Sequence, residues 1–303
     1  MSSFLPNAPI AARILKALRA QQSAKVIDFS AFKRGREQAE MLDQSMVTPT
    51  ELEGFYPGHA MYIVAQNWAS IMMETLTAME EAAKFAALIG AADEAYMPQG
   101  PPMSPITTSC FSMWAAFDAA VGLRNETLGS IILHLGQHLG VDGTTLRLVG
   151  AMQDSAMRVY SAISVDMDVV RLLDILSGQE LDAYCSAGRR IQQRELWLVR
   201  VLPPARDGEL AIAMTTPYVL QNADAPAWRA YFQRALGAAA ATPAKTQAAL
   251  KFRIDWLEYI FAAYASHSDS EVYLTGIPDQ PASLPHYSDC HPLARFGRGP
   301  KKK

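Results

Sequence analysis

Two histidines, His134 and His138, lie four residues apart in the segment HLGQH. On a helix this spacing places both imidazoles on one face, as in the zinc-binding helix of metalloproteases. Leu135, however, stands where that motif carries its catalytic glutamate, and nothing in the sequence indicates the third ligand that a zinc site requires. The pair is a candidate metal site of a metal-dependent hydrolase, and the alternative is two helix-face histidines without a metal.

Positive charge that could meet an anionic partner is concentrated in two places, an expected loop between strands and the end of the chain. The chain as a whole has a net charge of -3, so a nucleic-acid interface would be local to these side chains. The residues of this candidate nucleic-acid interface are Arg189, Arg190, Arg194, Arg295, Arg298, Lys301, Lys302 and Lys303.

The three cysteines, Cys110, Cys185 and Cys290, are odd in number and far apart, which fits a reducing compartment better than a disulfide framework. Cys110 lies between apolar residues of an expected helix and Cys185 closes an expected strand, so both are expected to pack in the core. The sequence also lacks a phosphate-binding GxxxxGK[ST] segment, a dinucleotide fingerprint and a GxSxG elbow. No catalytic residue and no cofactor is therefore expected.

The composition is that of an ordinary globular protein. Half of the 303 residues are hydrophobic, enough to bury one large core or two moderate ones. The N-terminal segment lacks the features of a signal peptide, and the apolar stretch near residue 88 is interrupted by charge and shorter than the roughly 20 residues that span a bilayer. A cytoplasmic location without membrane contact is expected.

The first half of the chain has helical periodicity. Apolar residues recur at spacings of three and four through residues 57–91, which predicts one long, mostly buried helix. The proline-rich segment YMPQGPPMSP then forms a connector, and three further helices are expected before residue 157, with Thr107 or Thr108 and Thr127 as possible starts. Helices are expected again after residue 221.

Between residues 157 and 221 the period becomes strand-like. Five short segments rich in β-branched and aromatic residues follow one another without intervening helices, which predicts antiparallel pairing. The expected fold is α+β, largely helical with an inserted small antiparallel β sheet or barrel. Its parts are an N-terminal helical, partly exposed segment (1–56), a helical domain (57–156), the antiparallel β module (157–221), C-terminal helices (222–270), and a loop with a basic tail (271–303).

The β module resembles one that recurs in uncharacterised bacterial proteins, where an LxDLxTGEE-like hairpin is followed by GELWxVRLLPP and TTPYVL. Here the hairpin reads LDILSGQE, with Ser177 and Gly178 making the turn and Asp174 able to cap it, and ELWLVRVLPP and TTPYVL follow. The resemblance covers about residues 96–235. It implies a fold family and no particular activity.

Some proteins with a similar hairpin carry a SEC-C metal-binding motif, CPCGSGKKYKKCC. The tail ARFGRGPKKK is similar to it at its glycines and lysines, but Ala294 and Phe296 stand where the first two cysteines belong. The tail is therefore either a degenerate form of that motif or a solvated basic end, and it supplies no zinc ligands at the required positions.

The expected function is that of a non-enzymatic, cytoplasmic bacterial protein acting through protein contacts, as a subunit or regulator, with a homo-oligomer as one option. One alternative is nucleic-acid binding through the loop arginines and the basic tail. A second alternative is the metal-dependent hydrolase suggested by the HLGQH helix.

Overall fold

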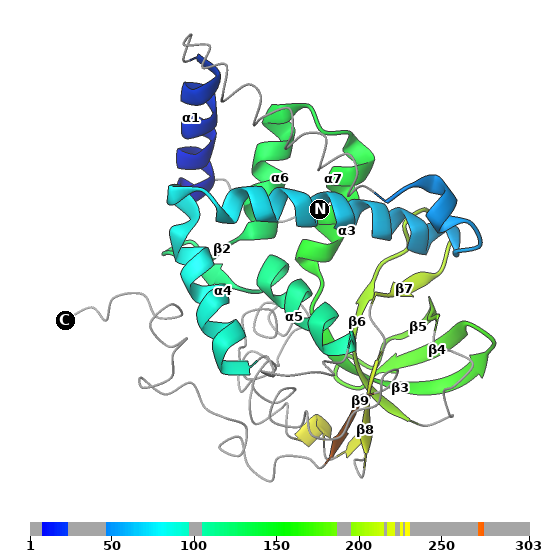
Figure 1. The fold of residues 1–303 in the computed structure, drawn as a ribbon. Helices are drawn as coiled ribbons and strands as arrows, with labels where there is room; N and C mark the ends of the chain where they lie inside the picture. The colour runs from blue at the N-terminus through cyan, green and yellow to red at the C-terminus, as the bar shows by residue number, and fades with distance from the viewer. Residues whose placement is uncertain are drawn as a thin grey trace.

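The structure is a computed structural model that describes residues 8–23, 47–96, 105–186, 195–214, 217–221, 225–226, 228–230 and 272–275. Its helices come first along the chain and gather on one side of the molecule, and a strand-built module follows on the other side (Figure 1). The fold is α+β, as predicted. The elements that precede the β module are α1 (Pro9–Ser23), η1 (Pro49–Leu52), α3 (Pro57–Thr77), η2 (Glu80–Ala82), α4 (Ala83–Tyr96), α5 (Pro105–Phe117), β1 (Ala120–Val121), β2 (Glu126–Thr127), α6 (Leu128–Leu139) and α7 (Gly143–Asp154).

The long helix expected over residues 57–91 is broken in two. Helix α3 ends at Thr77, Met79 adopts an extended conformation, and the chain resumes as η2 and α4. The break lets Leu76 from the end of α3 and Phe85 from the start of α4 enter the same apolar core. Periodicity alone missed the break because the apolar spacing continues through it.

Side-chain caps define the helices next to the β module. Thr127 caps α6 by accepting from the Ser130 amide, which confirms this helix start, whereas α5 begins at Pro105 instead of Thr107 or Thr108. Asp142 caps α7 by accepting from the Thr144 and Thr145 amides, and these hydrogen bonds lower the pKa of the Asp142 carboxyl.

The start of α1 is capped by a residue far away in the sequence. The carboxylate of Glu126, only 1% exposed, accepts hydrogen bonds from the backbone amides of Ile10 and Ala11 at 2.9 to 3.2 Å. A carboxylate at this place also faces the positive end of the helix dipole. Glu126 thus fixes α1 against the body of the protein.

Five strands close into a barrel in the order β3, β4, β5, β7, β6 and back to β3. Four of the five pairings are antiparallel, and the pairing of β5 with β7 is parallel. The prediction of an antiparallel module is therefore wrong for this one pairing. A closed ring with an odd number of strands cannot alternate direction throughout, so one parallel pair is unavoidable. The strands are β3 (Met157–Asp166), β4 (Val169–Asp174), β5 (Glu180–Tyr184), β6 (Leu196–Leu202) and β7 (Ala211–Ala213).

Two further strands extend the sheet beyond the barrel. β8 (Tyr218–Gln221) pairs antiparallel with β6, and β9 (Val272–Thr275) pairs parallel with β8. The sequence predicted β7 and β8 as one strand, and it predicted loop where β9 lies. β9 is a short strand that lies far from its partner β8 in the sequence. A local sequence pattern gives little indication of such a strand.

The barrel interior is filled by alternating side chains of each strand, as expected for period-two geometry. Tyr160 and Ala162, Val170 and Leu172, and Trp197 and Val199 are members of this cluster. A second, larger core lies among the helices and takes in Leu202 and Ile212 from the barrel end. The two cores therefore meet where β6 and β7 approach the helices.

A buried ion pair links the barrel to the helical part. Arg200 on β6 is 1% exposed and pairs with Asp118, which follows α5 and has a side chain 10% exposed. Arg200 Nη1 also donates to the Ser155 hydroxyl at 3.1 Å and approaches the Met152 carbonyl at 3.4 Å. This one side chain contacts α5, the end of α7 and the barrel.

Candidate binding cavity at the mouth of the barrel

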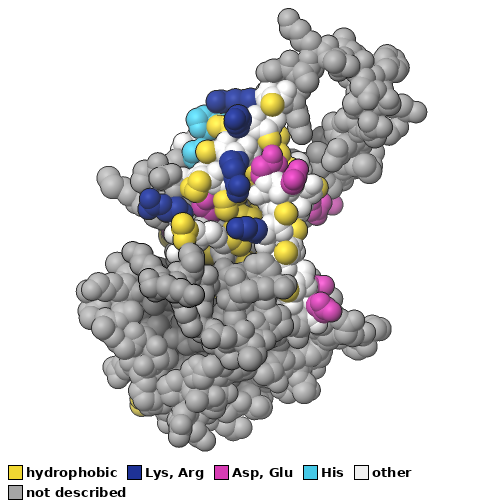
Figure 2. Space-filling model, turned by 90° about the vertical axis from the view of Figure 1, so that its left-hand side faces the viewer, with side chains coloured by type: hydrophobic (Ala, Val, Ile, Leu, Met, Phe, Trp, Pro, Cys, Tyr) yellow, Lys and Arg dark blue, Asp and Glu magenta, His cyan; other side chains and the backbone are white. Residues whose placement is uncertain are grey.

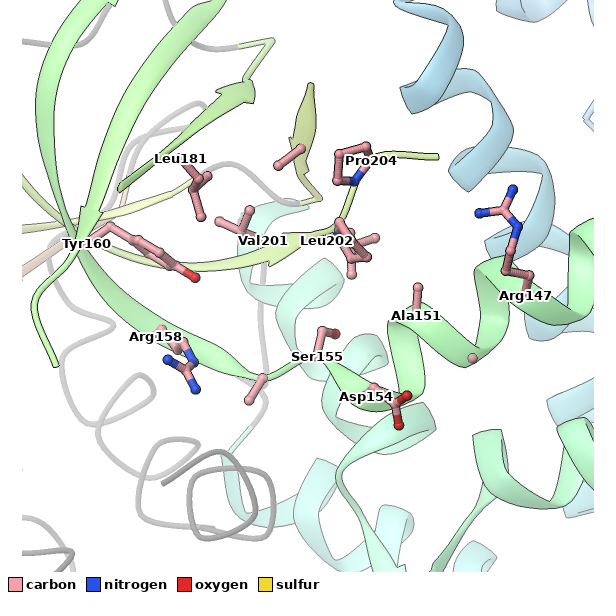
Figure 3. Close-up of a pocket in the computed structure, with 14 residues that line it drawn as sticks. Arg147, Ala151, Asp154, Ser155, Arg158, Tyr160, Leu181, Val201, Leu202 and Pro204 are labelled. Carbon is pink, nitrogen blue, oxygen red and sulfur yellow. The ribbon is translucent and has the colours of Figure 1, made fainter. Parts of the chain in front are cut away.

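A cavity of about 660 Å³ lies where the open end of the barrel faces helix α7 (Figure 3). Its volume is in the range of sites that hold a drug-sized molecule or a few residues of peptide. Inward-facing barrel residues form its inner end, α7 forms one wall, and the chain leaving β6 forms the opposite wall. The lining residues are Arg147, Gly150, Ala151, Asp154, Ser155, Ala156, Arg158, Tyr160, Leu181, Val201, Leu202, Pro203, Pro204 and Ala211.

Small side chains keep this space open. Helix α7 presents Gly150 and Ala151 to it, and Ala156 and Ala211 line it from the barrel side. Pro203 and Pro204 end β6, since proline has no amide to continue a ladder. The hydroxyl of Tyr62, on α3, donates to the Pro203 carbonyl at 2.8 Å and holds this wall in place. The walls are thus mostly apolar and anchored at both sides.

The inner end of the cavity carries a phenol. Tyr160 on β3 is 5% exposed, and its hydroxyl points toward the cavity (Figure 3). Within the described part of the chain, this hydroxyl makes no hydrogen bond. Burial, followed by the negative charge of Asp174, raises the pKa of Tyr160, so the phenol is neutral and able to donate. The ring is therefore buried while the hydroxyl opens onto the cavity, where a bound group can pair with it.

An ion pair lies beside Tyr160. Arg158, whose side chain is 14% exposed, pairs with Asp174, whose side chain is 5% exposed. Asp174 Oδ1 also accepts from the Leu176 and Ser177 amides at 2.8 and 3.2 Å, so the capping role predicted for Asp174 is confirmed. Because Asp174 balances Arg158, the inner end of the cavity is close to neutral overall.

The outer end has a different electrostatic character. Arg147 lies on α7 at this end, and Asp154 lies seven residues and therefore about 10 Å further along the helix axis, toward the barrel; both side chains are exposed. Arg147 forms no ion pair with any residue that the structure describes. Burial raises the pKa of Tyr62 to about 12, and the positive charge of Arg147 acts in the opposite direction. An uncompensated cation therefore marks the outer end.

The cavity opens beside an unpaired strand edge. β5 pairs with β4 along its full length, but with β7 only at Ala183 and Tyr184. Beyond that point the two strands diverge, and Leu181 and Ala211 border the gap on the cavity side. At residues 180–182, one side of β5 faces away from β4. This side forms no backbone pairing with any of the described strands. Such an edge offers backbone donors and acceptors to an added strand.

The histidines singled out in the sequence lie elsewhere, on α6. Their ring centroids are 5.2 Å apart, so His134 and His138 share a helix face as predicted. Partial burial, then the nearby His138, lowers the pKa of His134, while Glu126 opposes this shift. Searching the described residues finds no group of three or more His, Cys, Asp or Glu side chains that could hold a metal. Figure 2 shows histidine side chains exposed on one face of the molecule, close to basic side chains.

The other predicted residues contribute nothing to this cavity. Arg189, Arg190 and Arg194, together with the basic residues of the tail, fall outside the described residues, as does Cys290. Cys185 is 2% exposed in the barrel cluster, which confirms its expected place in the core. Cys110 belongs to α5, but its side chain falls outside the description.

Sequence reasoning missed the residues that line the cavity. One signal was present: Arg158 and Tyr160 alternate with Met157 and Val159 in a predicted strand, so the apolar inner face of that strand begins with a charged residue. Arg147 had no comparable signal, because its position relative to β3 and β5 depends on tertiary packing.

In the described part of the chain no helix combines the length and apolarity needed to cross a bilayer. Comparison with protein-family models, with curated proteins and with solved structures gives no significant match. The resemblance of residues 96–235 to a bacterial β module stays a prediction.

Proposed function

We propose that this protein acts in the cytoplasm by binding a segment of a partner protein, as a subunit or regulator, without catalysing a reaction of its own. The observation that carries the proposal is the cavity of about 660 Å³ at the barrel mouth, with mostly apolar walls and a few convergent polar groups. That combination is typical of a binding site.

The polar groups of the lining favour binding over chemistry. They are the guanidiniums of Arg147 and Arg158, the phenol of Tyr160, and the side chains of Ser155 and Asp154. Ser155 Oγ already donates to the Met152 carbonyl at 2.6 Å and accepts from Arg200 Nη1 at 3.1 Å. Among the lining residues that the structure describes, no nucleophile therefore lies next to a base, the arrangement on which covalent catalysis depends.

A peptide suits this site because the rim offers backbone partners as well as side-chain space. The edge of β5 at residues 180–182 borders the same opening as Leu181. A segment added to that edge would form ladder hydrogen bonds and direct alternate side chains into the cavity. A small molecule would use the cavity but leave the strand edge unsatisfied.

The experiment is a selection from a random displayed peptide library on the full chain, followed by fluorescence anisotropy with the selected peptides. Ala151→Phe places a ring in the cavity and should abolish binding. Gln137→Phe, at an exposed position of α6, adds the same ring to the surface and should leave binding unchanged. Circular dichroism must show that both variants are folded. Peptides that bind the Ala151→Phe variant as well as the wild type, or a library that yields no binder, would contradict the proposal.

A further inference from the structure

The chemistry of the lining defines what the bound segment must carry. We propose that the segment is extended, that it anchors at Tyr160 through an uncharged side chain ending in an oxygen, such as tyrosine, and that an acidic residue further along the segment meets Arg147. This inference rests on the proposed function and names the partner chemistry of the same site.

The anchor follows from the inner end of the cavity. The Tyr160 side chain is 5% exposed, its hydroxyl has no hydrogen-bond partner among the described residues, and this hydroxyl points into the cavity (Figure 3). Because Asp174 already balances the charge of Arg158, a further carboxylate there would stand close to that buried acid without a cation of its own. A neutral side chain with an apolar body and a terminal oxygen accepts a hydrogen bond from the phenol without placing a second buried negative charge near Asp174.

Helix α7 runs along the cavity from Arg147 toward the barrel end near Ser155, and Tyr160 lies beyond that end on β3 (Figure 3). Arg147 and Ser155 alone are eight positions apart, hence about 12 Å along the helix axis. An extended chain advances about 3.3 Å per residue, so an acid that reaches Arg147 lies several residues away from the anchor.

The probes are end-capped, fluorescein-labelled peptides with tyrosine as anchor, threonine at the other positions and one glutamate placed two to seven positions away, made in both directions. Anisotropy titrations with the full chain should give a clear optimum at one spacing, and weaker binding when the glutamate is only two positions away. Exchanging the glutamate for lysine should weaken binding about threefold to tenfold, and in the Arg147→Glu variant lysine should be preferred instead.

The anchor is tested by a double-mutant cycle. Replacing the peptide tyrosine by phenylalanine removes the terminal oxygen and should weaken binding to the wild type about fivefold. The same replacement should have no effect on binding to the Tyr160→Phe variant, in which the phenol is already gone. A purely structural role of Tyr160 would weaken both peptides equally in that variant.

The outcomes separate the two proposals. If selected peptides bind and Ala151→Phe blocks them, the binding function stands. The proposed anchor and charge pattern is wrong if glutamate spacing is without effect, if Arg147→Glu leaves the charge preference unchanged, or if tyrosine and phenylalanine anchors bind the wild type alike. The pattern is equally wrong if library peptides bind in the cavity and none of the designed series does. If no peptide of any kind binds, both proposals are overturned.

Discussion

The barrel contributes an arginine to each of two buried ion pairs, and the two pairs lie in opposite surroundings. Arg200 and Asp118 lie at the junction with the helices, where Arg200 also contacts Ser155 and the Met152 carbonyl. Arg158 and Asp174 lie beside a cavity. Two tyrosines repeat the contrast: the hydroxyl of Tyr62 is hydrogen bonded to the Pro203 carbonyl, whereas that of Tyr160 opens onto the cavity. The same residue types thus form internal contacts at the junction with the helices, whereas beside the cavity a hydroxyl remains open to the cavity.

Arg200→Met should have the largest effect. It leaves Asp118 buried without its cation at the place where α5, α7 and β6 meet, which should cost about 3 to 5 kcal/mol of unfolding free energy. Urea denaturation of the variant checks this. The double variant Asp118→Leu with Arg200→Met should recover part of the loss, since no buried charge then remains. A loss below about 1 kcal/mol in the single variant would remove the contrast between the two pairs.

Arg158→Met should cost less, about 1 to 3 kcal/mol, because Asp174 keeps its two backbone amide donors and water in the cavity can reach it. The matched control is Arg171→Met, which breaks the exposed pair with Asp182 on neighbouring strands β4 and β5. That control should change stability by at most about 1 kcal/mol. If Arg158→Met lowered the free energy of unfolding as much as Arg200→Met, access to water from the cavity would not stabilise Asp174 after the loss of its cation.

Tyr62→Phe should cost about 1 kcal/mol at neutral pH through loss of the hydrogen bond to the Pro203 carbonyl. Because burial raises the pKa of Tyr62 to about 12, the folded protein keeps this proton at a pH where the unfolded chain, with a tyrosine pKa of about 10, has released it. Stability should therefore fall as pH rises from about 10 to 12. The fall should be shallower in Tyr62→Phe, as thermal unfolding over that pH range would reveal. If the stability of the wild type and of Tyr62→Phe fell equally with rising pH, this prediction would be wrong.

Tyr160→Phe should have the smallest effect on the free protein, within about 0.5 kcal/mol of the wild type at neutral pH, because its hydroxyl has no partner to lose among the described residues. Thermal unfolding alongside Tyr62→Phe gives the comparison directly. A loss equal to that of Tyr62→Phe would mean that the hydroxyl supports the fold, and would remove the main reason to regard it as a binding group.

Local patterns predicted the local features of this molecule well. The strand period of residues 157–221, the cap at Thr127, the Asp174 turn and the shared face of His134 and His138 are all present. Each of these depends on residues within a few positions of one another.

The features that were missed depend on contacts across the chain. Barrel closure by the parallel pair of β5 and β7 is a property of five strands together, and β9 joins the sheet from beyond residue 270. The cavity combines Arg147 of α7, Leu181 of β5 and Pro203 after β6. No spacing rule relates such positions, so this site became visible only once the strands and helices had been placed in space.

The cap of α1 carries a consequence for the order in which the chain acquires structure. The amides that open α1 are made early in synthesis, yet the carboxylate that accepts from them belongs to Glu126, more than a hundred residues later. Until the ribosome has delivered β2, the first turn of α1 has only solvent to bond with. In refolding experiments, the amides of Ile10 and Ala11 should therefore become protected from hydrogen exchange together with those of α6, and no earlier.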